Sequence, residues 1–160
     1  MSDTLTSPAK DDWRLAGFLP YQLSIASNAV SDLIAERYRK RFGLKVTEWR
    51  IMAVLGDGAT STSTQQALTR ITLMDKVAVN RACKVLEERG LIRRVPNERD
   101  GRSHLLELTE EGRSIHGEVM PLALATEREL FEGFDPAERE QFRALLDRMY
   151  ARAADLAKGG

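Results

Sequence analysis

The stretch at 75–109, DKVAVNRACKVLEERGLIRRVPNERDGRSHLLELT, decides the fold. It opens with an N-capping aspartate, continues with helical spacing of apolar residues, and reaches a stop at Gly90. Two strand-length runs follow, LIRRV at 91–95 and HLLELT at 104–109. The break between them, PNERDGR at 96–102, holds a proline and an Asp-Gly turn pair, and four of its seven residues are charged. The pattern predicts a helix followed by a hairpin with a long charged tip.

Three helical patterns precede this stretch. The longest, at 19–43, has a proline in its first turn and Gly43 as its stop, and it carries apolar residues on more than one face. A short helix is predicted over 47–58, with Thr47 as its N-cap, and another over 64–71. These two short helices, the helix after them and the hairpin together predict a winged helix-turn-helix.

Two more helices follow the hairpin. The first is predicted over 110–134, with a kink at Pro121, and the second begins at the capping sequence DPAE, residues 135–138. The second helix carries a near-heptad apolar stripe, which suits packing against another long helix. The stripe consists of Phe142, Leu145, Leu146, Met149, Ala153 and Leu156.

The elements predict a mainly α fold with a small antiparallel β-hairpin (α+β), in which a winged helix-turn-helix is flanked by dimerisation helices. We expect a flexible tail at 1–12, an N-terminal dimerisation helix at 13–45, the winged helix-turn-helix DNA-binding region at 46–108, and C-terminal dimerisation helices at 109–160. A chain of this length predicts a single compact domain overall.

The composition fits a soluble globular protein. The chain has 160 residues, of which 42% are hydrophobic and 30% charged, and this excludes an intrinsically disordered chain. No apolar run approaches the roughly 18–20 residues that a membrane helix needs. The single cysteine, Cys83, allows no internal disulfide and suits a reducing cytosol, so we expect a cytoplasmic protein. Two histidines and one cysteine make a poor ligand set, and we expect neither a metal nor a cofactor.

Charge is unevenly distributed along the chain although its total is zero. Between residues 70 and 102 there are nine basic and five acidic residues, a local balance of +4. From residue 109 to the end there are seven basic and eleven acidic residues, a balance of −4. Because the local field sets where a polyanion docks, the middle of the chain is suited to nucleic acid.

The helix at 75–89 presents a face that suits a DNA groove. With its apolar residues placed inward, steps of about 100° put Arg81 and Lys84 on the opposite side and Ala78 and Asn80 on its flanks. Arginine can bind guanine, asparagine can pair with adenine, and small apolar groups can meet a thymine methyl. A solvated amphipathic helix has a similar face, but the tight turn before this helix and the basic hairpin after it favour DNA recognition.

The hairpin tip, at about 93–104, allows two interpretations. Charged residues decorate most exposed turns, so a plain solvated loop is one of them. The other is a DNA-contacting wing, because its arginines follow a candidate recognition helix and arginine is the preferred side chain for phosphates and for a narrow minor groove. These arginines are Arg93, Arg94, Arg99 and Arg102.

Several segments resemble the MarR family of bacterial transcription regulators. They are TEWRIMAVL, MDKVAVNRACKVLEERGLIRR, RDGRSHLLELTEEG and FDPAEREQFRALLDRM. The segment LPYQLSIASNAVSDLIAERYRKRFGL resembles the family's first dimerisation helix, so the resemblance spans about 15–155. It implies a winged helix-turn-helix regulator that binds double-stranded DNA.

The resemblance also implies roles for individual residues. In that family the arginine of the wing's Asp-x-Arg pair enters the minor groove and the aspartate helps to hold it, which implies these roles for Arg102 and Asp100. The start of the recognition helix implies a phosphate contact for Lys76 and base contacts for Ala78, Asn80 and Arg81. The predicted DNA-contacting set is Thr64, Gln65, Lys76, Ala78, Asn80, Arg81, Lys84, Arg94, Asp100 and Arg102.

The family further implies a homodimer that binds a pseudo-palindromic operator, most often as a repressor that a small aromatic or phenolic effector releases from DNA. Where the terminal helices meet the winged region, the candidate effector-binding residues are Tyr38, Trp49, Met52 and His116. The competing interpretation is that these side chains are ordinary core, since aromatic and methionine residues at helical spacing usually are.

The sequence bears on three alternatives to this function. An enzyme is not supported, because the sequence has neither a glycine-rich phosphate loop nor a set of nucleophile, histidine and carboxylate. A winged-helix module that binds only protein would not need the basic residues of the helix and the hairpin. A redox-responsive regulator would use Cys83, but this cysteine is predicted on the inward face of its helix, where a thiol is usually inert core.

Overall fold

The computed structural model describes residues 14–58 and 61–160. The tail predicted at 1–12 therefore lies outside the described residues. Contacts divide the chain into two compact units, one that ends at Val119 and one that begins at Met120. Within the described ranges, no helix has both the length and the apolarity needed to cross a bilayer.

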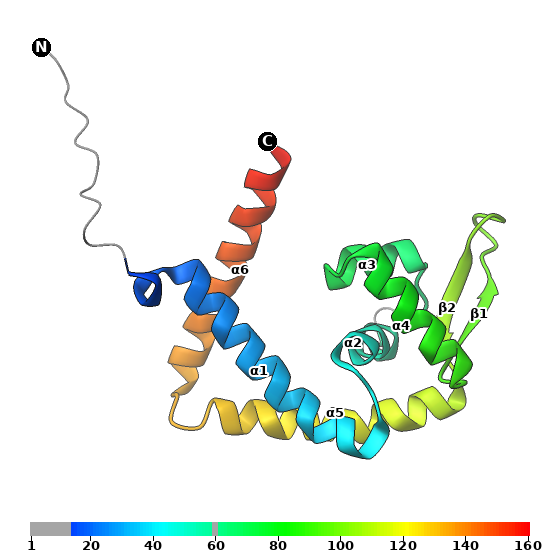
Figure 1. Ribbon diagram of the computed structural model, residues 1–160, viewed down its shortest axis with the longest axis horizontal. Coiled ribbons are helices and arrows are strands. Elements are labelled where there is room, and N and C mark those ends of the chain that lie inside the picture. The colour runs from blue at the N-terminus through cyan, green and yellow to red at the C-terminus, as the bar shows by residue number, and fades with distance from the viewer. Residues whose placement is uncertain (1–13, 59–60) are drawn as a thin grey trace, which may run out of the picture. The chain divides into compact units, whose positions relative to one another are not determined.

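The first unit is helical apart from one hairpin (Figure 1). In chain order its elements are the 3-10 helix η1 (Leu15–Gly17), the helices α1 (Leu19–Phe42), α2 (Val46–Gly56), α3 (Gln65–Thr72) and α4 (Lys76–Glu88), and the strands β1 (Ile92–Pro96) and β2 (His104–Leu108). The helix α5 (Glu110–Leu130) begins in the first unit and continues into the second. The order confirms the predicted mainly helical winged helix-turn-helix fold.

The core of the winged region lies between α2, α3, α4 and the hairpin, which contact one another. Each helix contributes fully buried side chains, among them Ile51 of α2, Leu68 of α3 and Leu86 of α4, and Leu106 of β2 joins them. Burying each such side chain contributes about 1.5–3 kcal/mol. The core fixes the exposed faces of α3 and α4 relative to the hairpin.

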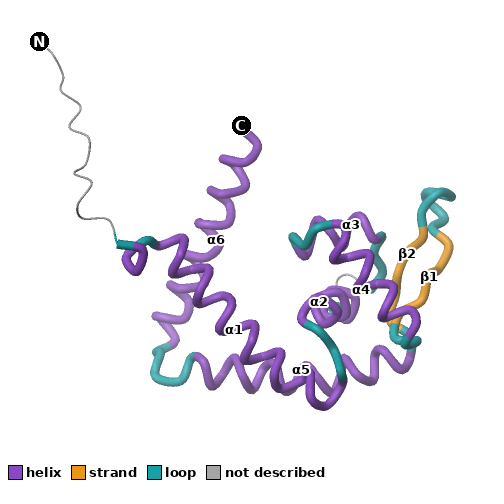
Figure 2. The backbone as a smooth tube through the Cα atoms, viewed as in Figure 1, coloured by secondary structure: helices purple, strands orange, loops and turns teal. Residues whose placement is uncertain are grey.

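The strands β1 and β2 form an antiparallel hairpin (Figure 2). Arg94 lies opposite Leu106, and Arg93 lies opposite Glu107. Leu106 also exchanges backbone hydrogen bonds with Ser63, which ties the chain before α3 to the hairpin. Side chains alternate between the two faces of a strand. Arg94 therefore lies on the same face as buried Leu106, toward the core, whereas Arg93 lies on the outer face.

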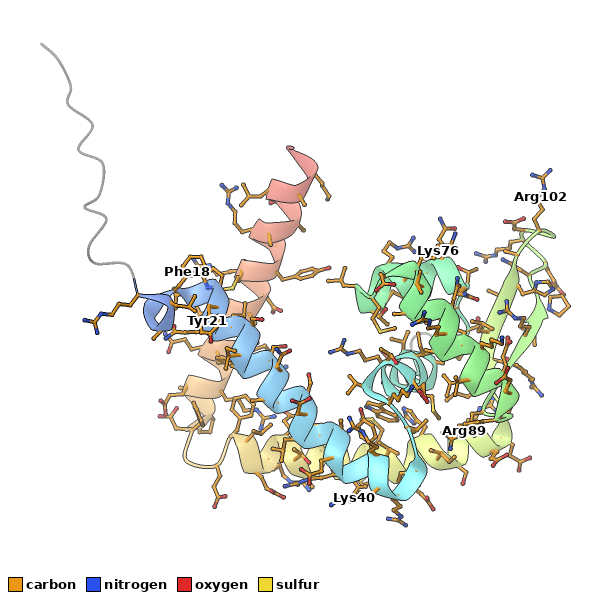
Figure 3. All side chains as sticks on the ribbon, viewed as in Figure 1. Phe18, Tyr21, Lys40, Lys76, Arg89 and Arg102 are labelled. Atoms are coloured by element: carbon orange, nitrogen blue, oxygen red, sulfur yellow. The ribbon has the colours of Figure 1, made fainter. Side chains whose placement is uncertain are left out.

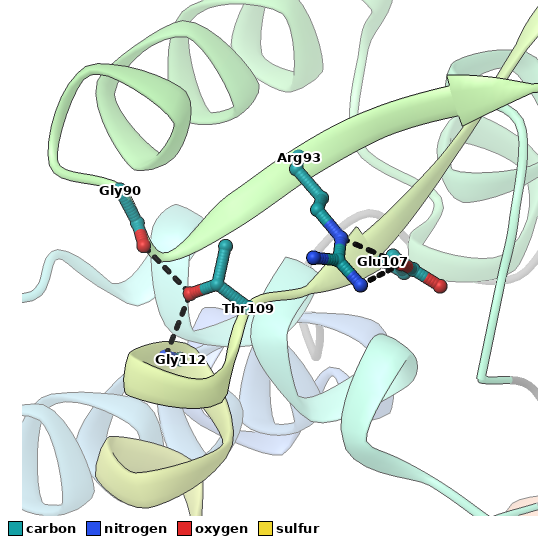
Figure 4. A network of polar contacts seen from close by, with 5 residues as sticks. All are labelled: Gly90, Arg93, Glu107, Thr109 and Gly112. Carbon is teal, nitrogen blue, oxygen red and sulfur yellow. Dashed lines mark hydrogen bonds and ion pairs between the residues drawn. The ribbon is translucent and has the colours of Figure 1, made fainter.

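The segment LTEEG after the hairpin joins three elements (Figure 4). The Thr109 hydroxyl donates to the Gly90 carbonyl at 2.6 Å and accepts from the Gly112 N–H at 3.1 Å. It thus caps α5 while it holds the end of α4. Gly112 is required here for space, because a Cβ at this position would lie 2.0 Å from the Leu91 carbonyl oxygen.

In the second unit, α6 (Pro136–Lys158) begins with the predicted capping box, in which the Asp135 carboxylate accepts from the Glu138 N–H at 2.8 Å. Phe131 packs edge-on against Phe142, and the guanidinium of Arg139 lies over the Phe131 ring. The rest of the α6 stripe is exposed, and no residue of α6 is buried.

Two local predictions were wrong. Thr47 does not cap α2, because the helix begins at Val46 and its N-cap is Lys45, which makes no side-chain capping bond. The carbonyl of Lys45 already accepts from the Trp49 N–H at 2.9 Å, so Thr47 lies inside the first turn. The helix predicted over 110–134 ends at Leu130. Pro121, the predicted site of a kink, lies inside α5.

Candidate nucleic-acid interface

The helix α4 is capped and oriented as predicted. The Asp75 carboxylate accepts from the Ala78 N–H at 2.8 Å, which satisfies a free donor of the first turn. The four residues expected to face inward are all buried, and the cationic side chains Lys76, Arg81 and Lys84 are exposed. Asn80 is exposed beside them and Ala78 is half-buried. The buried residues are Val79, Ala82, Cys83 and Leu86.

The helix α3 starts at Thr64, whose side chain accepts from the Ala67 N–H at 3.0 Å. Between α3 and α4 runs a groove lined by six polar residues. They are Gln65, Gln66, Thr69, Arg70, Lys76 and Asn80. Three of these, Gln66, Thr69 and Arg70, are absent from the predicted set. The spacing of Gln66 and Arg70, four residues apart around buried Leu68, was the signal that could have identified them.

The wing tip is a chain of turns held by its own side chains. The Asp100 carboxylate accepts from the backbone N–H of Arg102 at 3.0 Å, and Asn97 accepts from the backbone N–H of Arg99 at 3.2 Å. Asn97 also donates to the Ser103 hydroxyl at 2.9 Å. Asp100 therefore holds Arg102 through its backbone, which leaves the guanidinium available.

Lys76 and Arg102 lie on one side of the first unit. In Figure 3 Lys76, at the start of α4, and Arg102, at the tip of the hairpin, point toward the same edge, and Lys40 and Arg89 lie toward the other. Over residues 14–58 and 61–160, the structure has no ion pair to the side chains of Lys76, Arg81, Lys84 or Arg102. These unpaired cations give the start of α4 and the wing tip a positive surface.

Two of the other three wing arginines, Arg93 and Arg94, are already paired. Arg93 donates its Nε to Glu107 at 2.7 Å across the outer face of the hairpin (Figure 4). Arg94, which was predicted to contact DNA, lies 2.5 Å from the Glu87 carboxylate through its Nε and donates to Gln65 at 3.1 Å. A second groove, between α3 and the wing, is lined by Thr64, Gln65, Arg94, Asp100 and Arg102 among others.

The four candidate effector residues lie in one part of the first unit. The rings of Tyr38 and Trp49 are 5.8 Å apart, and Trp49 stacks with His116 at 5.5 Å and an interplanar angle of 29°. Tyr38, Trp49 and Met52 are buried. Burial raises the pKa of Tyr38 and lowers the pKa of His116. The rings of Tyr38, Trp49 and His116 form an aromatic cluster, and Met52 is buried three residues after Trp49 on α2.

Cys83 is buried on the inner face of α4. Burial raises the pKa of its thiol to about 11, and the nearby Arg94 opposes this shift only in part. Because the thiolate is the reactive form, this environment disfavours oxidation at neutral pH.

Comparison with known proteins agrees with this architecture. Residues 42–103 match the model of the MarR family. The transcriptional regulator PecS of Dickeya dadantii (strain 3937) is 27% identical over 119 residues, which cover 74% of this chain and 72% of PecS. The transcriptional repressor IacR of Pseudomonas putida is 23% identical over 143 residues, 88% of this chain and 82% of IacR.

Solved structures share the fold over most of its length. A MarR/EmrR family regulator from Acinetobacter sp. ADP1 superposes with a TM-score of 0.81 at 29% identity and covers 89% of this chain and 99% of its own. BpsR of Bordetella bronchiseptica, whose DNA binding is regulated by 6-hydroxynicotinic acid, has a TM-score of 0.76 at 22% identity and covers 86% of this chain and 96% of its own. At that identity the likeness to BpsR concerns the fold alone.

Proposed function

We propose that this chain is a homodimeric repressor that releases a pseudo-palindromic operator when it binds a small effector. The chain belongs to the MarR family of winged helix-turn-helix DNA-binding transcription regulators. Its family consists of regulators and not of enzymes. The observation that carries the proposal is the unpaired positive surface formed by the start of α4 and the wing tip. Regulation of this kind places the protein in the cytoplasm, where the DNA is.

The DNA contacts divide between the two elements of this surface. Lys76 binds a phosphate, and the side chains that follow it on α4 enter the major groove, where Asn80 and Arg81 can read base edges. Arg102 enters the adjacent minor groove, and Asp100 holds its backbone. The rest of the predicted set borders the same two grooves or the exposed face of α4, namely Thr64, Gln65, Ala78, Lys84 and Arg94.

Dimerisation is supported by the long helices. Large apolar side chains are exposed on α1, such as Leu19 and Ile25, and on α6, such as Leu145 and Met149. Exposed large apolar side chains gathered on one helix mark an interaction site, and each of the two helices carries such a set. Two copies related by a two-fold axis would place two recognition helices in successive major grooves, about 34 Å apart.

Repression is supported by a relative, and release by the aromatic cluster of this chain. IacR is a repressor, and the DNA binding of BpsR responds to an aromatic acid. In this chain the cluster of Tyr38, Trp49, Met52 and His116 offers the aromatic surfaces that a small aromatic or phenolic effector needs. Such an effector relieves repression only if it binds better to the arrangement that cannot hold the operator.

The DNA-binding part is tested by selection from a library of randomised duplexes, followed by titration of the selected duplex and a scrambled one over a salt series. We expect a pseudo-palindromic sequence, steep weakening with salt, and a salt slope that falls by about one in Arg102→Ala. The matched control is Lys40→Ala, which removes an exposed cation on the other side of the unit and should leave the slope unchanged. Equal binding of both duplexes by the natural protein would refute specific recognition.

The effector part is tested by melting-temperature shifts with a panel of aromatic acids that includes 6-hydroxynicotinic acid. A compound that raises the melting temperature should also displace the selected duplex. Trp49→Leu should abolish that shift while the protein still melts cooperatively. A flat response over the panel would assign the cluster to the core alone.

A further inference from the structure

A chain of four polar side chains connects the wing to the recognition helix. The Glu87 carboxylate of α4 pairs with Arg94 Nε of β1 at 2.5 Å, and Arg94 Nη2 donates to Gln65 Oε1 of α3 at 3.1 Å. Gln65 Nε2 in turn donates to Asn80 Oδ1 on α4. We call this series from Glu87 to Asn80 the polar relay. It starts and ends on the recognition helix and passes through both neighbouring elements.

The position of Arg94 in the relay follows from the hairpin register. Arg94 is paired with Leu106 and therefore shares the core-facing side of the hairpin, where α3 and α4 lie. Its guanidinium is neutralised by Glu87, whose side chain is only 29% exposed. An arginine neutralised in this way carries little net charge for a phosphate. Arg94 is therefore placed to orient the Gln65 side chain and not to bind a phosphate.

The relay fixes the direction of each amide group because its members differ in what they can donate. A guanidinium has only donors, so Gln65 must turn its oxygen toward Arg94. The Gln65 NH2 group then faces Asn80, and Asn80 must present its oxygen to Gln65. The orientation of Asn80 thus follows from a residue two hydrogen bonds away.

We propose that the polar relay makes Asn80 a hydrogen-bond donor toward DNA, so that it selects guanine and not adenine in the major groove. The proposal rests on the proposed DNA-binding function and specifies what one residue of that surface reads. Bidentate pairing with adenine requires both the oxygen and the NH2 group of asparagine. Gln65 occupies one of the two lone pairs of the oxygen and draws it toward α3. The NH2 group is therefore the part directed to the base, and it fits the O6 and N7 acceptors of guanine.

The test is selection of randomised duplexes by the full chain and by four variants. Asn80→Ala identifies the base pair that Asn80 reads, as the position at which preference disappears. In the natural protein this pair should be G·C, favoured over A·T by roughly five- to hundredfold. Arg94→Met releases Gln65, so guanine and adenine should become nearly equivalent there while the remaining positions keep their preferences.

Gln65→Glu should invert the hydrogen-bonding character that Asn80 presents to DNA. A general loss of structure would weaken binding without changing which base is preferred. A carboxylate at this position accepts from Arg94 and from the NH2 group of Asn80, so the oxygen of Asn80 turns outward. Selection at the position of that guanine should shift toward a base with a major-groove donor, adenine through N6 or cytosine through N4. The matched control is Arg93→Met, which removes the neighbouring arginine and its pair with Glu107 on the other face of the hairpin. It should leave the base preference unchanged.

The outcomes separate this proposal from the proposed function. If the natural protein enriches no sequence, specific DNA binding itself fails. If a sequence is enriched but its Asn80-dependent pair is A·T, or if Gln65→Glu does not shift it, the relay proposal fails and the function stands. If Arg94→Met instead weakens all sequences equally and lowers the salt slope by about one, Arg94 is a phosphate contact and the relay assignment is wrong.

Discussion

Replacing Gly56 with alanine should destabilise the winged unit through one defined collision. Gly56 is the last residue of α2, and a Cβ built on it would lie 2.2 Å from Nε2 and 2.3 Å from Cδ2 of His116. The imidazole cannot simply move outward without loss, because it stacks on Trp49 at 5.5 Å. The added methyl must therefore disrupt the aromatic cluster or separate α2 from α5.

The magnitude follows from two opposing effects. Alanine in place of glycine within a helix usually stabilises by about 0.5–1 kcal/mol. Forcing an extra carbon into an occupied space costs about 1–3 kcal/mol. We expect the free energy of unfolding to fall by about 1–2 kcal/mol in Gly56→Ala, because the collision is with a ring packed on one side. In Gly117→Ala, at an exposed position of α5 with no atom within 4 Å of the new Cβ, it should rise by about 0.5–1 kcal/mol.

The assay is urea unfolding at one fixed protein concentration, since a homodimer's apparent stability depends on concentration. A double-mutant cycle with His116→Ala isolates the collision, because removal of the ring opens the space that the methyl needs. We expect Gly56→Ala to be neutral or stabilising in that background, with a coupling energy of about 1–3 kcal/mol. An equal effect of Gly56→Ala with and without the His116 ring would refute the reasoning.

Four further outcomes are expected. Asp75→Ala should lower the free energy of unfolding by about 1 kcal/mol in urea titrations, and Asp75→Asn, which can still cap, should not. Gly112→Ala should destabilise the protein by at least about 2 kcal/mol in the same assay, because its Cβ would meet the backbone oxygen of Leu91 at 2.0 Å and backbone yields less than a side chain. The Cys83 thiol, with a pKa of about 11, should react with iodoacetamide at pH 8 only after urea is added, and rapid reaction in the native state would contradict its burial. Burial lowers the pKa of His116 from its usual 6.5, so the imidazole binds a proton at a higher pH in the unfolded chain than in the folded chain. Stability should therefore fall as the pH drops through that value, and His116→Gln should flatten this dependence.

The sequence predicted those features that are set by local spacing. The inward face of α4 follows from helical periodicity, and Asp75 and Asp135 cap their helices because each precedes a first turn that needs an acceptor. The turn pair in the wing and its support of Arg102 are also local, since Asp100 reaches an N–H only two residues away. The wrong cap at Thr47 shows the limit of local reasoning, because Lys45 and Val46 lack any capping signal and yet begin the helix.

The rest of the candidate site depends on register and on contacts between distant residues. Arg94 and Gln65 are 29 positions apart in the sequence, and they meet only because the hairpin register places Arg94 on the core-facing side. Shifting the pairing by one residue would put Arg93 there instead. Likewise no local pattern indicates that Gly56 lies against His116, since the two are brought together by packing of α2 on α5.

The far end of the recognition helix is held by the helices that lead out of the winged region. Arg89, just after α4, donates to the carbonyls of Phe42 and Gly43 at 2.7 and 3.1 Å, at the end of α1 (Figure 3). A cation at a helix C-terminus is also favoured by the helix dipole. Thr109 joins the chain just beyond α4 to the start of α5 through the Gly90 carbonyl. A displacement of α1 or α5 that keeps these bonds must carry the end of α4 with it.

The aromatic cluster lies about one helical turn from these same anchor points. Tyr38 is four residues before Phe42 on α1, and His116 is four residues after Gly112 on α5. A molecule that separates their rings therefore acts on the two helix ends to which α4 is bonded. It can shift the equilibrium between two positions of the recognition helix by no more than the difference between its free energies of binding to them. By contrast the groove-facing end of α4 is held by its own cap at Asp75 and by the polar relay. Under the proposed function, the bonds at Arg89 and Thr109 set where the recognition helix lies, and the polar relay sets what it reads.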